Sequence, residues 1–144
     1  MTTARDLMKP CPCIQETATV KEIVEKLAGD DQALVVVDSQ GDLQGIVTEF
    51  DLVKLIHQAA DYDFEDGVVG GGLPAYLGMS VEELKVLTAG DIMTRDPDTV
   101  PLDMSLEDLA ETMFRNRRKV ILVAEDGRFQ GMIQRMDLVK SVLG

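Results

Sequence analysis

Apolar residues recur at the spacing of one helical face in two separate stretches of the chain. The first stretch begins at Thr19 and the second at Ser105, and each hydroxyl residue is followed three positions later by an acid, Glu22 or Asp108. A hydroxyl and an acid at this spacing satisfy free amide groups at a helix start. The sequence therefore predicts an amphipathic helix after each hydroxyl residue.

Each predicted helix is followed by two short apolar runs around a turn that contains glycine. The runs cover residues 34–37 and 45–47 in the first case, and residues 120–123 and 131–133 in the second. Short runs rich in β-branched residues on both sides of such a turn are typical of a β-hairpin. A further helical pattern follows each hairpin. Its apolar residues are Leu52, Val53 and Ile56 in one case and Leu138, Val139 and Val142 in the other.

The two units are copies of one repeat. Residues 13–54 align without a gap with residues 99–140, and upstream of them the register slips by one position. Self-similarity of this kind indicates a tandem repeat. Across the slip, the paired residues are Asp6 with Asp91, Met8 with Met93, and Pro12 with Pro97.

The repeat has the order β-α-β-β-α, which places the chain in the α/β (α+β) class. One copy of about 45 residues can hardly bury its own sheet and helices. We therefore expect the two copies to pack as a pseudo-twofold pair, with a cleft on each side of the axis. Residues 1–60 are expected to form repeat 1, residues 61–88 an acidic, glycine-rich linker with a short helix, and residues 89–144 repeat 2.

Composition narrows the range of partners. The formal net charge of −12 disfavours nucleic acid and anionic membranes, because both are bound through clustered Lys and Arg. No apolar run reaches the roughly 20 residues that span a bilayer, and the first residues lack a secretory signal, so we expect a cytoplasmic protein. Two cysteines close together in sequence exclude a disulfide framework, and with the single His57 a zinc site of His and Cys would need outside ligands.

The segment after the first hairpin turn carries a family motif. The string GIVTEFDLVKLI at residues 45–56, the repeat layout, and the DLM and DIM openings of the two copies resemble a tandem cystathionine-beta-synthase-type (CBS) domain pair. The resemblance covers nearly the whole chain. In that family, the pattern Gly, apolar, x, Thr or Ser, x, x, Asp marks an adenosyl-ligand site. The resemblance thus implies that Asp51 holds ribose hydroxyls and that Thr48 contacts a phosphate.

Elementary chemistry agrees with these two roles. A helix start attracts anions through its free amide groups, and a carboxylate accepts hydrogen bonds from neighbouring sugar hydroxyls. A second interpretation stays open, because Thr48 and Asp51 also have the spacing of a capping box, which needs no ligand.

The resemblance adds two further groups to the implied site. It places the segment before the first helix beside the adenine, and this segment consists of Lys9, Pro10, Cys11, Pro12 and Cys13. It places basic residues of the opposite copy beside the phosphates, and these are Arg117, Arg118 and Lys119. Guanidinium groups bind phosphate as bidentate donors. The alternatives are a redox or metal role, or a simple loop, for the cysteines, and a solvated edge that discourages aggregation for the basic cluster.

The equivalent site of the second copy departs from the pattern. Gln134 stands at the position of Thr48, although Asp137 is retained. Across from it, Asp30, Asp31 and Gln32 replace the basic residues, and carboxylates repel a phosphate. We therefore expect one competent nucleotide site per chain, and a second, weaker site that remains open to a neutral or cationic ligand such as S-adenosylmethionine.

Together these features favour a regulatory sensor of AMP, ADP or ATP that signals to an unidentified partner. No nucleophile, base and oxyanion or metal site stand together as an enzyme would require, and no cofactor is implied. Two alternatives remain open, a ligand-free dimerisation or interaction scaffold and a binder of S-adenosylmethionine. The resemblance also implies a homodimer, joined through the helix that follows each hairpin.

Overall fold

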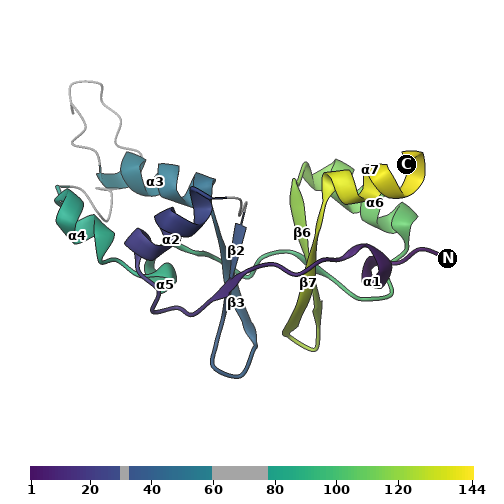
Figure 1. Ribbon diagram of the computed structural model, residues 1–144, viewed down its shortest axis with the longest axis horizontal. Coiled ribbons are helices and arrows are strands. Elements are labelled where there is room, and N and C mark those ends of the chain that lie inside the picture. The colour runs from purple at the N-terminus through teal and green to yellow at the C-terminus, as the bar shows by residue number, and fades with distance from the viewer. Residues whose placement is uncertain (30–32, 60–77) are drawn as a thin grey trace.

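The computed structural model describes residues 1–29, 33–59 and 78–144. Figure 1 shows two β-hairpins side by side at the centre of an elongated molecule, with helices on each outer flank. Most of the expected linker, including its acidic and triple-glycine stretches, lies outside the described residues, as do Asp30, Asp31 and Gln32. The linker's end contains the expected short helix, α4 (Val81–Lys85), where the Ser80 hydroxyl accepts a hydrogen bond from the Glu83 amide at 3.2 Å.

Both repeats form the predicted order of helix, hairpin and helix. Repeat 1 contains α2 (Val20–Leu27), β2 (Ala33–Val37), β3 (Leu43–Thr48) and α3 (Glu49–Ala59). Repeat 2 contains α6 (Leu106–Asn116), β6 (Val120–Glu125), β7 (Arg128–Gln134) and α7 (Arg135–Leu143). The Thr19 hydroxyl accepts from the Glu22 amide at 3.3 Å, and the Ser105 hydroxyl accepts from the Asp108 amide at 3.2 Å. The predicted fold class and both predicted helix starts are confirmed.

A leading segment precedes the first long helix of each repeat, covering residues 1–18 in repeat 1 and residues 88–104 in repeat 2. The first contains α1 (Ala4–Leu7) and β1 (Cys13–Ile14), and the second contains α5 (Ala89–Ile92), β4 (Thr94–Arg95) and β5 (Thr99–Val100). Figure 1 shows both segments running between the two halves of the molecule. Each leading segment therefore begins beside one repeat and ends in the sheet of the other.

The strand pairing shows this exchange, in which each leading segment also pairs with the opposite repeat. One sheet has the order β1-β2-β3-β4, and the other has the order β5-β6-β7. Strand β4 comes from the leading segment of repeat 2, yet it pairs antiparallel with β3 of repeat 1, with Thr94 opposite Ile46. In the other half, Lys9 forms a bridge to Met132 of β7 through two backbone hydrogen bonds of 2.9 Å.

Glycine at one repeat position makes the exchange sterically possible. A Cβ atom on Gly45 would lie 2.7 Å from the Thr94 carbonyl oxygen and 2.7 Å from the Met93 sulfur. At the equivalent Gly131, the nearest contact would be 3.1 Å, to the Lys9 carbonyl and the Met8 side chain. The leading segments thus pack directly on the backbone of the second hairpin strand, where a Cβ atom would clash at Gly45 and make a tight contact at Gly131.

The apolar core follows the same exchange. Ala4, from the first leading segment, is fully buried in the cluster of repeat 2 around Leu109 and Ile133. Ala89, from the second leading segment, is fully buried in the cluster of repeat 1 around Ile23. A third cluster joins the two sheets and consists of Cys11, Val35, Val37, Leu122 and Met132. The two repeats therefore share their cores, as the small size of one copy predicts.

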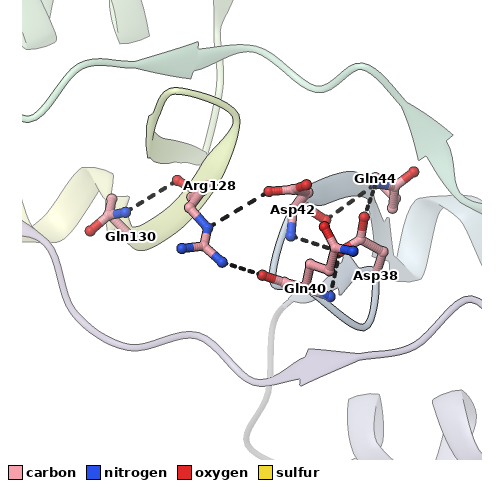
Figure 2. Close-up of polar contacts among 6 residues, drawn as sticks. All are labelled: Asp38, Gln40, Asp42, Gln44, Arg128 and Gln130. Carbon is pink, nitrogen blue, oxygen red and sulfur yellow. Dashed lines mark hydrogen bonds and ion pairs between the residues drawn. The ribbon is translucent and has the colours of Figure 1, made fainter.

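The two hairpin turns lie next to each other, where Asp42 and Arg128 form a bridge. Figure 2 shows Arg128 between the two turns, where its guanidinium donates to the Gln40 carbonyl and lies 3.7 Å from the Asp42 carboxylate. The Leu43 amide also donates to the Gly127 carbonyl at 2.9 Å. Within the first turn, the Asp38 carboxylate accepts from the amides of Gln40 and Asp42. The contacts of Arg128 and Leu43 join the two sheets at their tips, and the Asp38 bonds stabilise the first turn.

None of the helices described is both long and apolar enough to cross a membrane.

Candidate functional site

The carboxylate of Asp51 lies where β3 ends and α3 begins, and groups from both repeats hold it. One oxygen accepts from the Thr48 amide at 2.9 Å and from the Thr48 hydroxyl at 3.4 Å. The other accepts from the hydroxyl of Thr94, at the start of β4, at 2.9 Å. Asp51 is only 5% exposed, and it is the one buried charged residue among those described. A carboxylate has about four acceptor positions, so these three bonds leave room for one more donor.

The equivalent carboxylate in repeat 2 has a charged partner instead. One oxygen of Asp137 accepts from the Gln134 amide at 2.7 Å, and the other lies 3.4 Å from the ammonium nitrogen of Lys9. The same ammonium group donates to the Gln134 side-chain oxygen at 2.6 Å. The sequence grouped Lys9 with Thr48 and Asp51, whereas its contacts are with Gln134 and Asp137, because the leading segments cross between the repeats.

The capping interpretation of Thr48 and Asp51 describes their geometry correctly. The same arrangement of amide, hydroxyl and carboxylate occurs at Thr3 with Asp6, and at Thr88 with Asp91, where short helices begin. A Thr and an Asp at this spacing therefore do not by themselves indicate a ligand site. Asp51 also accepts a hydrogen bond from the opposite repeat, and this contact depends on the long-range fold.

The two cysteines of the first leading segment lie in different surroundings, because Cys11 belongs to the cluster between the sheets and Cys13 is exposed in the edge strand β1. Cys11 is 7% exposed and its thiol donates to the Ala33 carbonyl at 3.4 Å, while the Pro12 carbonyl accepts from the Val35 amide at 3.0 Å. Partial burial raises the pKa of the Cys13 thiol above its usual value. A raised pKa leaves less of the reactive thiolate at neutral pH, which argues against a redox or metal role. Within residues 1–29, 33–59 and 78–144, no three His, Cys, Asp or Glu side chains gather as a metal site would require.

The basic cluster lies in the connection between α6 and β6. Arg117 ends α6 in the left-handed conformation, with φ of 50°. The Arg118 guanidinium forms an ion pair with Asp98 at 2.8 Å. Three groups of Arg135, at the start of α7, bind three consecutive carbonyls of this connection: the backbone amide donates to Lys119 at 3.1 Å, Nε to Arg118 at 2.7 Å, and Nη2 to Arg117 at 3.0 Å.

The basic cluster and Asp51 contact the same leading segment. Thr94 binds Asp51 and Asp98 binds Arg118, and these two residues are four positions apart, which limits their Cα separation to about 14 Å. In the part of the chain that the structure describes, no hydrogen bond or ion pair joins the cluster directly to Thr48 or Asp51. The side chain of Arg117 lines a groove between α6 and α7, together with Arg115, Arg135 and Phe114.

Sequence reasoning missed three of these residues. Thr94 has a signal in the sequence, because it follows Met93 as Lys9 follows the equivalent Met8. Asp98 has a signal too, since it is the residue without a counterpart where the register of the repeats slips. Arg135 has none, because its role depends on where α6 ends.

The outer faces of the helices carry exposed apolar side chains. Val53 and Ile56 of α3 are 60% and 66% exposed, and Val142 of α7 is 63% exposed. Two of the apolar residues named from the sequence face inward instead, because Leu138 is 8% exposed in the core of repeat 2 and Leu52 packs against the core of repeat 1. Among the further exposed apolar residues on α3, α6 and α7 are Phe50, Phe114 and Met136, which were not among the residues named from the sequence for this face.

Comparisons with known proteins agree with this architecture. The CBS domain family model matches residues 4–58 and 89–144. A protein solved under the description "CBSX2 in complex with AMP" is 22% identical, with 99% of this chain and 97% of that chain covered and a TM-score of 0.76. The CBS-domain containing protein ATU1752 from Agrobacterium tumefaciens is 25% identical, with 97% and 92% covered and a TM-score of 0.69.

Curated sequences include a relative that is much longer than this chain. Arabinose 5-phosphate isomerase KpsF from Escherichia coli is 26% identical over 140 residues. The match covers 95% of this chain but 36% of KpsF, so the chain spans about a third of the length of that relative.

Proposed function

The chain belongs to the CBS domain family, and on that premise we propose that it is a regulatory module that binds an adenine nucleotide between its repeats. AMP, ADP or ATP would occupy the cleft between the repeats. The resulting change in the arrangement of the repeats would pass to a partner protein in the cytoplasm. The observation that carries the proposal is the buried carboxylate of Asp51, which both repeats hold through Thr48 and Thr94. A ligand that bonds to this carboxylate would contact both repeats and bias their relative arrangement.

The roles of the remaining groups follow from their chemistry. The ribose hydroxyls would donate to Asp51 and displace Thr94 from one oxygen. The phosphate would take the free amides at the start of α3 and the cations of Arg117, Arg118 and Lys119. The adenine would lie along Pro10, Cys11, Pro12 and Cys13. Support for an adenine ligand comes from CBSX2, a protein of similar fold solved in complex with AMP.

The second set of groups, Gln134 and Asp137, is proposed as the weaker site. The Lys9 ammonium group binds both side chains, so a ligand must displace a cation to reach the carboxylate. A cationic ligand such as S-adenosylmethionine would replace one positive charge with another there, which is the least costly exchange.

Ligand-induced stabilisation is the direct test. A nucleotide at 100 times its dissociation constant should stabilise the wild type by about 2.7 kcal/mol. We expect a thermal shift with AMP or ATP that is lost in Asp51→Asn, which preserves the side-chain volume, and kept in the matched Asp137→Asn. Because either substitution alters the unliganded protein, each shift is measured against the same variant without ligand. An absence of any shift with AMP, ATP and S-adenosylmethionine would favour the interaction scaffold instead.

We also propose that the chain forms a homodimer through its outer helices. The support is the row of exposed apolar residues on α3 and α7, which includes Val53, Ile56 and Val142. The regulated partner is proposed to be an enzyme or transporter domain, since this chain spans only a third of the isomerase KpsF. Catalysis is not assigned to the chain itself.

The dimer has its own test. Carboxylates introduced by Val53→Glu and Ile56→Glu should weaken self-association by more than about tenfold, because burying a charge in an apolar contact is costly. Sedimentation velocity measures the change. Val81→Glu is the control, because Val81 is 65% exposed on a different helix, α4. Equal sedimentation of all variants would contradict the dimer.

A further inference from the structure

Arg135 holds the connection between α6 and β6 in one conformation. Its amide, Nε and Nη2 groups donate to the carbonyls of Lys119, Arg118 and Arg117, at 3.1, 2.7 and 3.0 Å. Charged donors form stronger hydrogen bonds to carbonyls than neutral donors do. One residue is thus the common partner of three consecutive carbonyls, and two of its three donors belong to the charged guanidinium group.

The connection needs such a partner because its conformation is unfavourable. Arg117 adopts φ of 50° and ψ of 39°, the left-handed region that a residue with a Cβ atom seldom occupies. The carbonyls at the end of α6 also carry the negative end of the helix dipole, which attracts a guanidinium group. Without the Arg135 side chain, the connection would lose the bonds to the Arg118 and Arg117 carbonyls and the positive charge beside the end of α6, while the backbone bond to Lys119 would remain.

Repeat 1 lacks this arrangement. The residue of repeat 1 at the position of Arg135 is Glu49. A carboxylate accepts hydrogen bonds but cannot donate them to carbonyls. The inserted residue Asp98 adds a second constraint in repeat 2, because it holds the Arg118 side chain at 2.8 Å. Repeat 2 therefore fixes both the backbone and one side chain of its connection.

We propose that Arg135 is a positioning residue that presents the cations of Arg117 and Lys119 to the phosphate of the bound nucleotide. This inference rests on the proposed function, since it requires a phosphorylated ligand in the cleft. Arg135 is assigned a positioning role and not a ligand contact, because its Nε and Nη2 groups donate to the carbonyls of Arg118 and Arg117. Its contribution is to fix the backbone from which the neighbouring cations extend, which lowers the entropy lost on binding.

Arg115 provides a matched control. It lines the same groove as Arg135 and carries the same charge, but its guanidinium bonds to Glu111 on its own helix at 2.8 Å. Arg115→Ala therefore removes one positive charge from the same surface and leaves the connection intact. Arg135→Lys keeps the charge but retains one donor group in place of the planar guanidinium.

The first measurement is independent of any ligand. Limited proteolysis with trypsin reports on the bonds after Arg117 and Arg118, which are cleaved only when the connection opens. We expect several-fold faster cleavage at these bonds in Arg135→Ala, a smaller increase in Arg135→Lys, and no change in Arg115→Ala. Unchanged cleavage in Arg135→Ala overturns the inference.

The second measurement compares AMP with adenosine by titration calorimetry. In Arg135→Ala we expect AMP to bind about tenfold more weakly, with adenosine affinity unchanged, because only the phosphate contacts are affected. Arg115→Ala should bind both ligands as the wild type does. Faster cleavage without a loss of AMP affinity overturns the role in phosphate binding. A wild type that binds none of AMP, ADP and ATP overturns the proposed function and the phosphate role with it, while the proteolysis result still decides whether Arg135 orders the connection.

Discussion

The two repeats have the same backbone fold, but they differ in the charges that face their equivalent carboxylates. In repeat 1, the partner of Asp51 is the neutral hydroxyl of Thr94, and in repeat 2 the partner of Asp137 is the ammonium group of Lys9. Both partners come from the leading segment of the opposite repeat. The fold therefore fixes where each carboxylate lies, while the crossing segment determines what charge it meets.

The difference has a consequence for specificity. A ligand that reaches Asp51 competes with a hydroxyl, whereas a ligand that reaches Asp137 must displace an ion pair. A substitution in the leading segment of one repeat therefore changes the site of the other repeat. The two leading segments also differ in how closely they approach the hairpin strand on which they pack. This difference gives the largest expected effect on stability.

Replacing the glycine under each leading segment should affect the repeats unequally. In Gly45→Ala the new methyl group would lie 2.7 Å from a backbone carbonyl oxygen, which cannot move without shifting β4. We expect a loss of about 2 to 3 kcal/mol in the free energy of unfolding. In Gly131→Ala the nearest contact is 3.1 Å, and we expect a loss of about 1 kcal/mol.

Chemical denaturation with both variants measures this difference. Gly29→Ala is the control, because the nearest contact of its new methyl group would be 3.4 Å, an ordinary van der Waals distance. Equal losses at Gly45 and Gly131 would contradict the tighter packing of β4 in repeat 1.

Most of the fold could be predicted from the sequence because its signals are local and occur twice. Each of these signals spans only a few residues, as in the capping pairs at Thr19 and Ser105 and the glycine turns at Gly41 and Gly127. The exchange of leading segments could not be predicted in this way. It depends on which hairpin each segment pairs with, and a two-residue strand such as β4 has too few residues to show a pattern.

The candidate site was predicted in part for the same reason. Thr48 and Asp51 belong to one local motif, and the structure brings them together. Lys9 was grouped with them by its place in the sequence, but the crossing of the leading segment takes it to Asp137. The bonds from Arg135 to the basic connection arise only in the folded protein, since they join residues 17 and 18 positions apart.

Removing the partner of each carboxylate should again affect the stability of the two repeats unequally. In Thr94→Val, one oxygen of the 5% exposed Asp51 loses its donor, and we expect a loss of about 1 to 2 kcal/mol in the free energy of unfolding. In Lys9→Met, the lost ion pair has side chains that are 41% and 21% exposed. Solvent screens such a pair, so we expect a loss below about 1 kcal/mol.

Denaturant titration of the two variants at neutral pH tests this order. Thr94→Ser is the matched control, because it keeps the hydroxyl and should retain most of the stability that the valine variant loses. A larger loss in Lys9→Met than in Thr94→Val would contradict the view that the carboxylate of repeat 1 is the more buried of the two.

The smallest expected effect concerns the inserted residue Asp98, which has no counterpart in repeat 1. Its ion pair with Arg118 joins side chains that are 53% and 54% exposed, so it adds little stability. It does, however, compete with a phosphate for the same guanidinium group. In Asp98→Asn we expect AMP to bind about two- to threefold more tightly with adenosine unchanged, because Arg118 is released. Asp103→Asn controls for the loss of one negative charge, since Asp103 is exposed on the same leading segment. Calorimetry with both ligands measures the effect, and an equal gain in the two variants would attribute it to net charge rather than to Arg118.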